Sequence, residues 1–272
     1  MTEETVTPRT LYLSGDAGTI VMRDGPALKV RRPGVAERNF PLRRLLRVMV
    51  SGQVRWDTSA LMACADARVP VSFVRADGTV RARLANGSGG RRGLLDLNGT
   101  LRIFLDENER VRIYRDWIDA CARNERLRLV YEAQRGAWPT QPQVLRRLLF
   151  NRVKDQARAN DVRRFDRNFR ALLADLVQDR LGGLGVDTEL PVLAVNEIDL
   201  VRDFAGILEW GESNAKLKFI KREYAAARRR GFRHPELDWR AAVHCFESRE
   251  RDISDRFDAL FRRFHQYMLE TV

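Results

Sequence analysis

The spacing of apolar residues changes once along the chain, and this change limits the folds that the sequence can adopt. Over the first 85 residues, apolar positions occur in short alternating or β-branched runs closed by Gly, Asp or Pro, a pattern typical of strands and turns. From Ile103 onward they recur three and four residues apart, as in amphipathic helices. The sequence therefore predicts an α+β protein, with a small N-terminal β-rich domain at residues 1–85 and a larger all-α helical domain at residues 103–272.

A glycine-rich segment separates the two patterns. Residues 86–92 have the sequence NGSGGRR, with three glycines in seven positions, and such a segment resists regular structure. We therefore expect residues 86–102 to form the interdomain linker.

Within the first domain, five segments have strand character. They are LYLSG at 11–15, TIVMRDG at 19–25, ALKVRRPG at 27–34, LLRVMVSG at 45–52 and PVSFVRA at 70–76. Before the last of these, Asp57 or Thr58 can cap a helix that runs through SALMACADA. After it, an Asp-Gly pair predicts a hairpin turn into TVRARL.

The second domain has five segments with helical spacing, and we expect them to pack as a bundle. They cover residues 111–134, 143–161, 168–183, 199–231 and 238–270. Proline and glycine mark the natural breaks between them, at Pro139, Pro142, Gly182–Gly183, Gly231 and Pro235.

The charge balance favours a polyanionic partner. Lys and Arg number 49 against 37 Asp and Glu, which gives a formal net charge of +12. A positive field of this kind attracts nucleic acid, because phosphate contacts release condensed counterions. The alternative is a surface that is basic throughout without serving a ligand.

Basic residues also cluster along one predicted helix and its exit. Long cationic side chains suit sequence-independent phosphate contact. The alternative for each residue is a solvated helical face, and the helix dipole by itself favours cations at a C-terminus. The predicted nucleic-acid-binding residues are Lys216, Lys218, Lys221, Arg222, Arg228, Arg229 and Arg230.

Cysteine usage and hydropathy indicate a cytoplasmic protein. Cys64, Cys121 and Cys245 are far apart and have no CxxC spacing, which argues against a zinc ribbon and a disulfide framework. The chain has no run of about 20 apolar residues, and the acidic, polar N-terminus is unlike a signal peptide. We expect no association with a membrane.

Four segments of the N-terminal half occur in an order that resembles a known family. They are LYLSGDAGTIVM at 11–22, PLRRLLRVMV at 41–50, SGQVRWDTSALMACADARVPVSFV at 51–74 and ADGTVRARL at 76–84. Together they resemble the β-domain of the CRISPR-associated spacer-acquisition integrase, a metal-dependent nuclease family that inserts captured DNA into repeat arrays.

The helical half carries a second resemblance to this family. The segment from Glu212 to Phe219, ESNAKLKF, resembles the helical motif around the first metal-ligand glutamate of the integrases. The resemblance implies that Glu212 is catalytic and binds Mg or Mn. The alternative is that Glu212 only caps a helix that starts after Trp210 and Gly211.

Phosphodiester transfer with a divalent ion needs two or three converging ligands. The family adds a histidine in a GF-x-H motif and a downstream acid, and GFRH at 231–234 matches those letters. In one continuous helix, however, Glu212 and His234 would lie about 30 Å apart. In an antiparallel pair of helices Glu212 would face residues 252–258 instead, and His244 would lie two or three turns away. His244 and Glu247, three residues apart, could place two ligands on one helical face. The predicted metal ligands are Glu212, His244 and Asp255.

A different alignment leads to another interpretation. RHPELDWRAA at 233–242 resembles the family segment that precedes the catalytic histidine. On this alignment the chain stops before the histidine and the final acid are reached. The protein would then be a shortened or divergent, inactive member.

The resemblance implies a protein that binds duplex or branched DNA through its helical domain and forms a homodimer through its β-domain. With a complete site it would be a Mg- or Mn-dependent endonuclease and integrase that nicks and joins DNA. The alternative is an inactive relative that serves as a nucleic-acid-binding scaffold beside CRISPR adaptation or other antiviral defence subunits. A third interpretation is a basic helical protein that binds a partner protein.

Overall fold

A computed structural model describes residues 9–75, 80–84, 96–132 and 141–271. The chain divides into two compact units, Met1–Ser88 and Gly89–Val272. The glycine-rich segment and the predicted Asp-Gly turn lie outside the described residues. Residues 97–102, which the sequence assigned to the linker, form the start of helix α2 (Leu97–Leu105).

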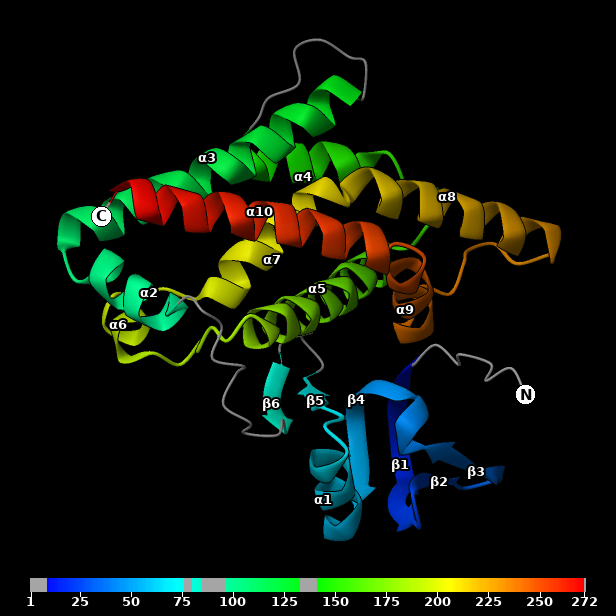
Figure 1. Cartoon of the computed structure of the whole chain (residues 1–272). Helices are drawn as coiled ribbons and strands as arrows, with labels where there is room; N and C mark the ends of the chain where they lie inside the picture. The colour runs from blue at the N-terminus through cyan, green and yellow to red at the C-terminus, as the bar shows by residue number, and fades with distance from the viewer. Residues whose placement is uncertain (1–8, 76–79, 85–95, 133–140, 272) are drawn as a thin grey trace, which may run out of the picture. The chain divides into compact units, whose positions relative to one another are not determined.

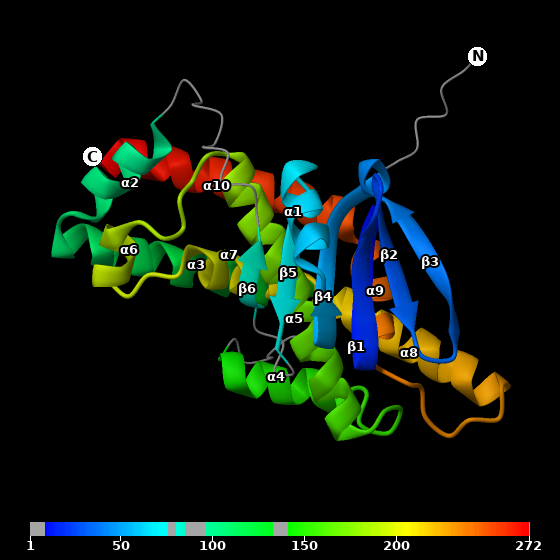
Figure 2. The same cartoon turned by 90° about the horizontal axis from the view of Figure 1, so that it is seen from below.

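The first unit is a mixed sheet. Its described strands are β1 (Arg9–Asp24), β2 (Ala27–Arg32), β3 (Val35–Pro41), β4 (Leu45–Trp56), β5 (Val71–Val74) and β6 (Val80–Leu84). They pair in the order β3-β2-β1-β4-β5-β6 (Figure 2). The pairs β1–β4 and β4–β5 are parallel, whereas β1–β2, β2–β3 and β5–β6 are antiparallel.

The connection between β4 and β5 contains helix α1 (Thr58–Asp66), and a short 3-10 helix, η1 (Leu42–Arg44), precedes β4. The carboxylate of Asp57 accepts a hydrogen bond from the backbone N–H of Ser59 at 3.2 Å, so Asp57 is the N-cap of α1. The hydrophobic core of this unit forms where α1 covers the sheet. It includes Leu13, Val21, Leu28, Val48, Val50, Ala60, Cys64 and Val71.

Two glycines allow β1 and β4 to approach closely. A Cβ atom on Gly15 would overlap the backbone of Gln53. Gly52 has a φ of +86°, and a Cβ there would lie 2.6 Å from the carbonyl oxygen of Gly15. The pairing shifts register between Gly15 and Thr19, so the two strands predicted at 11–15 and 19–25 are one irregular strand, β1.

The second unit consists of helices. Besides α2, the described helices are α3 (Asn108–Glu132), α4 (Pro142–Asn151), α5 (Ala159–Gly183), α6 (Pro191–Val195), α7 (Leu200–Gly211), α8 (Ser213–Arg229), α9 (Trp239–Glu247) and α10 (Glu250–Thr271). Helix α7 packs against α3, α5 and α10 (Figure 1). These two units confirm the predicted fold class, a β-rich N-terminal part followed by a helical part.

Aromatic side chains fill the space where α7 meets α10 and α3. Phe204 on α7 is fully buried and lies 5.6 to 6.1 Å, between ring centroids, from Phe257, Phe261 and Phe264 on α10. Trp117 on α3 packs against Phe264 at 5.1 Å. Large rings of this kind contribute much of the buried apolar area of a helical core.

The helix predicted at 143–161 ends at Asn151 in the structure, and its last residues belong to α5, which begins at Ala159. Two further predicted helices are each broken. The segment 199–231 forms α7 and α8, which meet at Glu212, and the segment 238–270 forms α9 and α10, which are separated by Ser248 and Arg249. Each segment keeps helical spacing of apolar residues on both sides of its break, and for this reason the sequence pattern did not reveal either break. Among the described residues, no helix is both long and apolar enough to cross a membrane.

Candidate nucleic-acid interface

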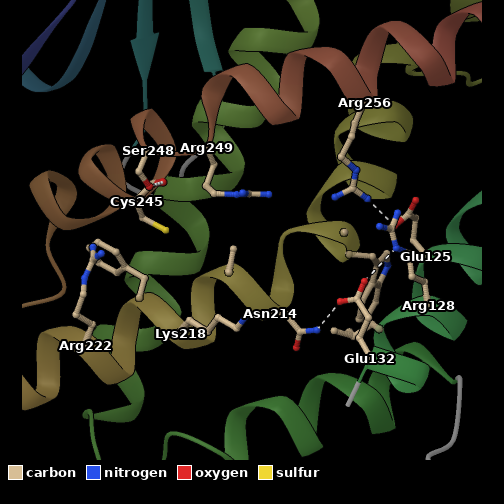
Figure 3. A pocket seen from close by; sticks show the side chains of 15 residues that line it. Glu125, Arg128, Glu132, Asn214, Lys218, Arg222, Cys245, Ser248, Arg249 and Arg256 are labelled. Atoms are coloured by element: carbon tan, nitrogen blue, oxygen red, sulfur yellow. Dashed lines mark hydrogen bonds and ion pairs between the residues drawn. The ribbon is translucent and has the colours of Figure 1, made fainter. Parts of the chain in front are cut away.

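Helices α3, α7, α8, α9 and α10 surround an open cleft of about 440 Å³ in the helical unit (Figure 3). Its wall is mostly polar and carries five cationic side chains and two carboxylates. The lining residues are Glu125, Arg128, Leu129, Glu132, Trp210, Gly211, Asn214, Ala215, Lys218, Phe219, Arg222, Cys245, Ser248, Arg249 and Arg256.

Glu212 lies directly behind this wall, at the break between α7 and α8. Its side chain is buried, and both carboxylate oxygens accept hydrogen bonds from arginines of the cleft. The Nε of Arg249 lies 3.0 Å from Oε2, and the Nη1 of Arg256 lies 3.1 Å from Oε1. A carboxylate removed from water needs such partners, because an unpaired buried charge is strongly destabilising.

The same two arginines bind further carboxylates. Arg256 donates from Nη2 to Glu125 on α3 at 2.6 Å, and Arg249 donates from Nη1 to Asp252. In Figure 3 Arg256 extends from α10 toward Glu125, and a dashed line marks this contact. The ion pairs thus join α3 and α10 to the junction of α7 and α8.

Gly211 makes room for this arrangement. A Cβ atom at position 211 would overlap the guanidinium of Arg256, whereas one at Gly206, on the same helix, would meet no atom within 4 Å. Glycine at position 211, directly before ESNAKLKF, therefore leaves the space that the guanidinium of Arg256 occupies.

Several groups of the cleft have shifted pKa values. The hydrogen bond to Glu212 raises the pKa of Arg249 above its ordinary value. The hydrogen bond from the Asn214 amide, at 3.0 Å, lowers the pKa of Glu132, and Arg128 acts in the same direction. Burial raises the pKa of the Cys245 thiol to about 12, so this cysteine stays protonated and is a poor nucleophile.

The described residues do not fit a Mg or Mn site of the predicted composition. Within them, no group of three or more His, Cys, Asp and Glu side chains could hold a metal ion, so Glu212, His244 and Asp255 do not converge. His244 and Asp255 are exposed. The Glu212 oxygens contact two guanidinium groups, which would repel a cation at the position where a metal would bind.

The predicted basic residues fall into three environments. Lys218 and Arg222, one helical turn apart on α8, line the cleft. Lys221, Arg228, Arg229 and Arg230 are exposed on α8 and at its C-terminal end but do not line the cleft.

Lys216 differs from this expectation because it is buried, with 7% of the residue exposed. Its Nζ lies 2.9 Å from Asp166 and 3.4 Å from Glu209, beside a second cavity of about 340 Å³ between α4, α5, α7 and α8. Burial opposes the charge of Lys216, but Asp166 and Glu209 outweigh it and raise the pKa. Lys216 is therefore held by carboxylates inside the unit and is not a surface contact for phosphate.

Sequence reasoning missed the arginines that complete the site. Arg249 and Arg256 are seven residues apart, a spacing that places two side chains on one face of a helix. This spacing was a usable signal, but it did not indicate which carboxylate the two arginines would meet. Glu125 comes from a helix that is 131 positions away from Arg256 in the sequence.

The fold has known relatives. A CAS1 protein from Thermotoga maritima matches with a TM-score of 0.69 and 10% identity, over 96% of this chain and 97% of that chain. A casposase bound to integration product matches with a TM-score of 0.62 and 14% identity, over 88% and 82% of the two chains. TtCas1 matches with a TM-score of 0.57 and 13% identity, over 93% and 98%. These low identities establish the fold alone.

Comparison of the sequence with protein families gives a more specific result. No curated protein matches the chain significantly. The family described as CRISPR associated protein Cas1 matches residues 11–173, from β1 into α5, which is more than half of the chain. Glu212, Arg249 and Arg256 lie beyond the matched residues. The match nevertheless shows that this chain belongs to the CRISPR-associated Cas1 family.

Proposed function

We propose that the chain binds duplex or branched DNA through the cleft between α3, α8, α9 and α10, as a non-catalytic subunit of a CRISPR defence assembly. The observation that carries the proposal is the set of cationic side chains, from three helices, that line one open cleft. Membership of the Cas1 family supports DNA as the polyanion, as does the shared fold of a casposase that is bound to integration product. Nucleic-acid affinity of this kind depends mainly on phosphate contacts.

The contacts of Glu212 favour binding over turnover. Metal-assisted strand transfer needs a ligand set with open positions for phosphate and nucleophile. Here both oxygens of the carboxylate that the resemblance assigns to the metal are already paired with Arg249 and Arg256. The described residues therefore support a DNA-binding scaffold better than a nuclease or an integrase that uses Mg or Mn.

The proposal includes a homodimer formed through the β-rich unit. Among the described strands, β3 lies at one edge of the sheet, and Val35 to Asn39 are exposed along it. An edge strand has unpaired backbone groups that can pair with another chain. Sedimentation velocity should give the mass of two chains, whereas a monomer at all concentrations would contradict this part of the proposal.

The test of DNA binding is its dependence on salt. We expect the affinity for a fluorescein-labelled duplex and for a branched DNA, measured by anisotropy, to fall steeply between about 50 and 200 mM salt. The double substitution Lys218→Gln with Arg222→Gln should weaken binding and reduce the slope of log affinity against log salt by about 1 for each lost phosphate contact.

The matched control is the double substitution Arg102→Gln with Arg167→Gln, which changes the net charge equally at two exposed positions outside the cleft. Equal losses in both double variants would indicate a diffuse charge effect and would contradict a specific cleft. Manganese-dependent nicking or joining by the wild type that is lost in Glu212→Ala would establish the catalytic alternative. Failure to bind DNA or RNA even at low salt would favour a partner protein instead.

A further inference from the structure

The two helix breaks of the helical unit meet at one ion-pair cluster. Glu212 lies at the break between α7 and α8, and Arg249 lies at the break between α9 and α10. Seven residues, or about two helical turns, further along, Arg256 on α10 reaches the other oxygen of the same carboxylate. Glu212 therefore fixes two guanidinium groups that come from different positions on the opposite segment.

This cluster has a buried anionic side and an exposed cationic side. The Glu212 side chain is 1% exposed, whereas the side chains of Arg249 and Arg256 are 34% and 26% exposed and both line the cleft. A group that enters the cleft thus meets the guanidiniums and not the Glu212 carboxylate beneath them, while Glu125 and Glu132 are the carboxylates that line the same cleft.

Both arginines keep unused donors. A guanidinium has five N–H donors in a rigid planar fork. Arg249 makes hydrogen bonds to Glu212 from Nε and Nη2 and to Asp252 from Nη1, and Arg256 makes one to Glu212 and one to Glu125. The remaining N–H groups can donate to the oxygens of a phosphate, an acceptor whose geometry matches the guanidinium fork.

The charge needed to hold an anion comes from the rest of the cleft. Glu212, Glu125 and Asp252 bring three negative charges to the two arginines, so the ion-pair cluster by itself has no excess of positive charge. Lys218 and Arg222 supply positive charge elsewhere on the same wall. In the described part of the chain, no carboxylate lies within ion-pair distance of Lys218, and the only carboxylate within that distance of Arg222 is its neighbour Glu223, at 3.8 Å.

We infer that Arg249 and Arg256 bind a backbone phosphate of DNA directly, that Glu212 is the positioning residue that holds their guanidiniums in place, and that no divalent metal takes part. This inference rests on the proposed function, since it specifies how the same cleft binds DNA. It assigns Glu212 a role other than the metal-ligand role that the sequence resemblance implies.

The first experiment tests the metal and does not require DNA. Isothermal titration of the wild type and of Glu212→Gln with MnCl₂ alone should show no difference in Mn²⁺ binding. Manganese binding that is present in the wild type and lost in Glu212→Gln would overturn the inference.

The second experiment tests the phosphate contact by anisotropy with duplex DNA. Wild-type affinity should be the same in EDTA and in MnCl₂. Arg249→Lys and Arg256→Lys keep the charge but lose the fork, and each should weaken binding about tenfold, the effect of one hydrogen-bonded contact to a charged group. Arg251→Lys, at an exposed position on α10 outside the cleft, is the matched control and should bind as the wild type does.

Glu212 is tested by graded replacement. Glu212→Gln should weaken DNA binding, and Glu212→Asp should restore part of it, because the carboxylate and not the mere presence of a side chain orients the arginines. Circular dichroism checks that each variant is folded. If Glu212→Gln fails to fold, Arg249→Lys and Arg256→Lys still test the phosphate contact.

The outcomes separate the inference from the proposed function. If Arg249→Lys and Arg256→Lys bind DNA as the wild type does, while the double variant Lys218→Gln with Arg222→Gln does not, the inference fails and the proposed function stands. If the wild type binds no DNA, the proposed function and the phosphate contact both fail, while the Mn²⁺ titration still decides whether Glu212 binds metal.

Discussion

At the scale of single residues, two lysines only two positions apart on α8 would look equivalent in the sequence but have different roles. Lys216 is held inside the unit by Asp166 and Glu209, whereas Lys218 is exposed and lines the cleft. Glu209 also accepts a 2.8 Å hydrogen bond from Arg170. Loss of one partner from such a buried network leaves charges without compensation.

We therefore expect Lys216→Met to lower the free energy of unfolding by about 3 kcal/mol. The matched substitution Lys218→Met, on the exposed side, should change it by no more than about 0.5 kcal/mol. Urea unfolding followed by circular dichroism measures both. A Lys216→Met protein as stable as Lys218→Met would show that the buried ion pairs contribute nothing.

A second residue-scale prediction concerns the two glycines of α7. Alanine is the better helix former by about 1 kcal/mol, so Gly206→Ala, where a Cβ meets no atom within 4 Å, should raise the thermal midpoint. Gly211→Ala should lower it instead, because the new methyl group displaces Arg256 from its carboxylate partners. The same variant should also weaken DNA binding. Equal stabilisation by both substitutions would mean that the Arg256 side chain can move away from position 211 without a loss of stability.

At the scale of elements, the sequence predicted most strands and helices, and the errors have identifiable causes. Strand β3 was missed because VAERNFP lacks alternating hydrophobicity, which marks a strand with one buried face, whereas residues 35–39 of β3 are all exposed. The breaks at Glu212 and at Ser248–Arg249 were missed because helical spacing of apolar residues continues across each break. Only contacts between the segments require the chain to bend there.

The start of α9 gives an element-scale prediction. The carboxylate of Asp238 accepts a hydrogen bond from the backbone N–H of Ala241 at 3.0 Å, and it caps the helix that carries Cys245 to the cleft. Asp238→Ala should cost about 1 kcal/mol of stability, whereas Asp238→Ser, which can still cap, should cost less. Thermal unfolding of the two variants distinguishes loss of the cap from loss of the charge, and equal losses would argue against capping.

At the scale of the whole molecule, the buried ion pairs give the stability a dependence on pH. Burial raises the pKa of Glu209, but Lys216 and Arg170 outweigh this effect, so the net pKa lies below the ordinary glutamate value. A lowered folded-state pKa contributes stability above the unfolded value of about 4.3, and this contribution is lost as the pH falls through the folded value. At alkaline pH Lys216 has the opposite effect. Its pKa is raised in the folded state, so its contribution to stability is present below the unfolded value of about 10.4 and is lost as the pH rises through the higher folded value.

We therefore expect the free energy of unfolding to fall as the pH is lowered from about 7 to about 3, and Glu209→Gln to reduce that fall. The difference between wild type and variant should be largest near neutral pH and should shrink in acid. Glu107→Gln, at a glutamate whose side chain is 63% exposed, is the control and should leave the pH profile unchanged. Parallel wild-type and Glu209→Gln profiles would contradict the assigned shift.

The sequence by itself determined the fold class, because the period of the apolar residues distinguishes strands from helices without any knowledge of their partners. It also pointed to the Cas1 family and to Glu212. The tertiary structure alone decided what Glu212 contacts, since Arg249 and Arg256 lie 37 and 44 positions away in the sequence. It likewise decided that Lys216 is buried while Lys218 lines the cleft. The physical reason is that spacing along a helix fixes which residues share a face, whereas the partner of a charged side chain depends on how separate helices pack.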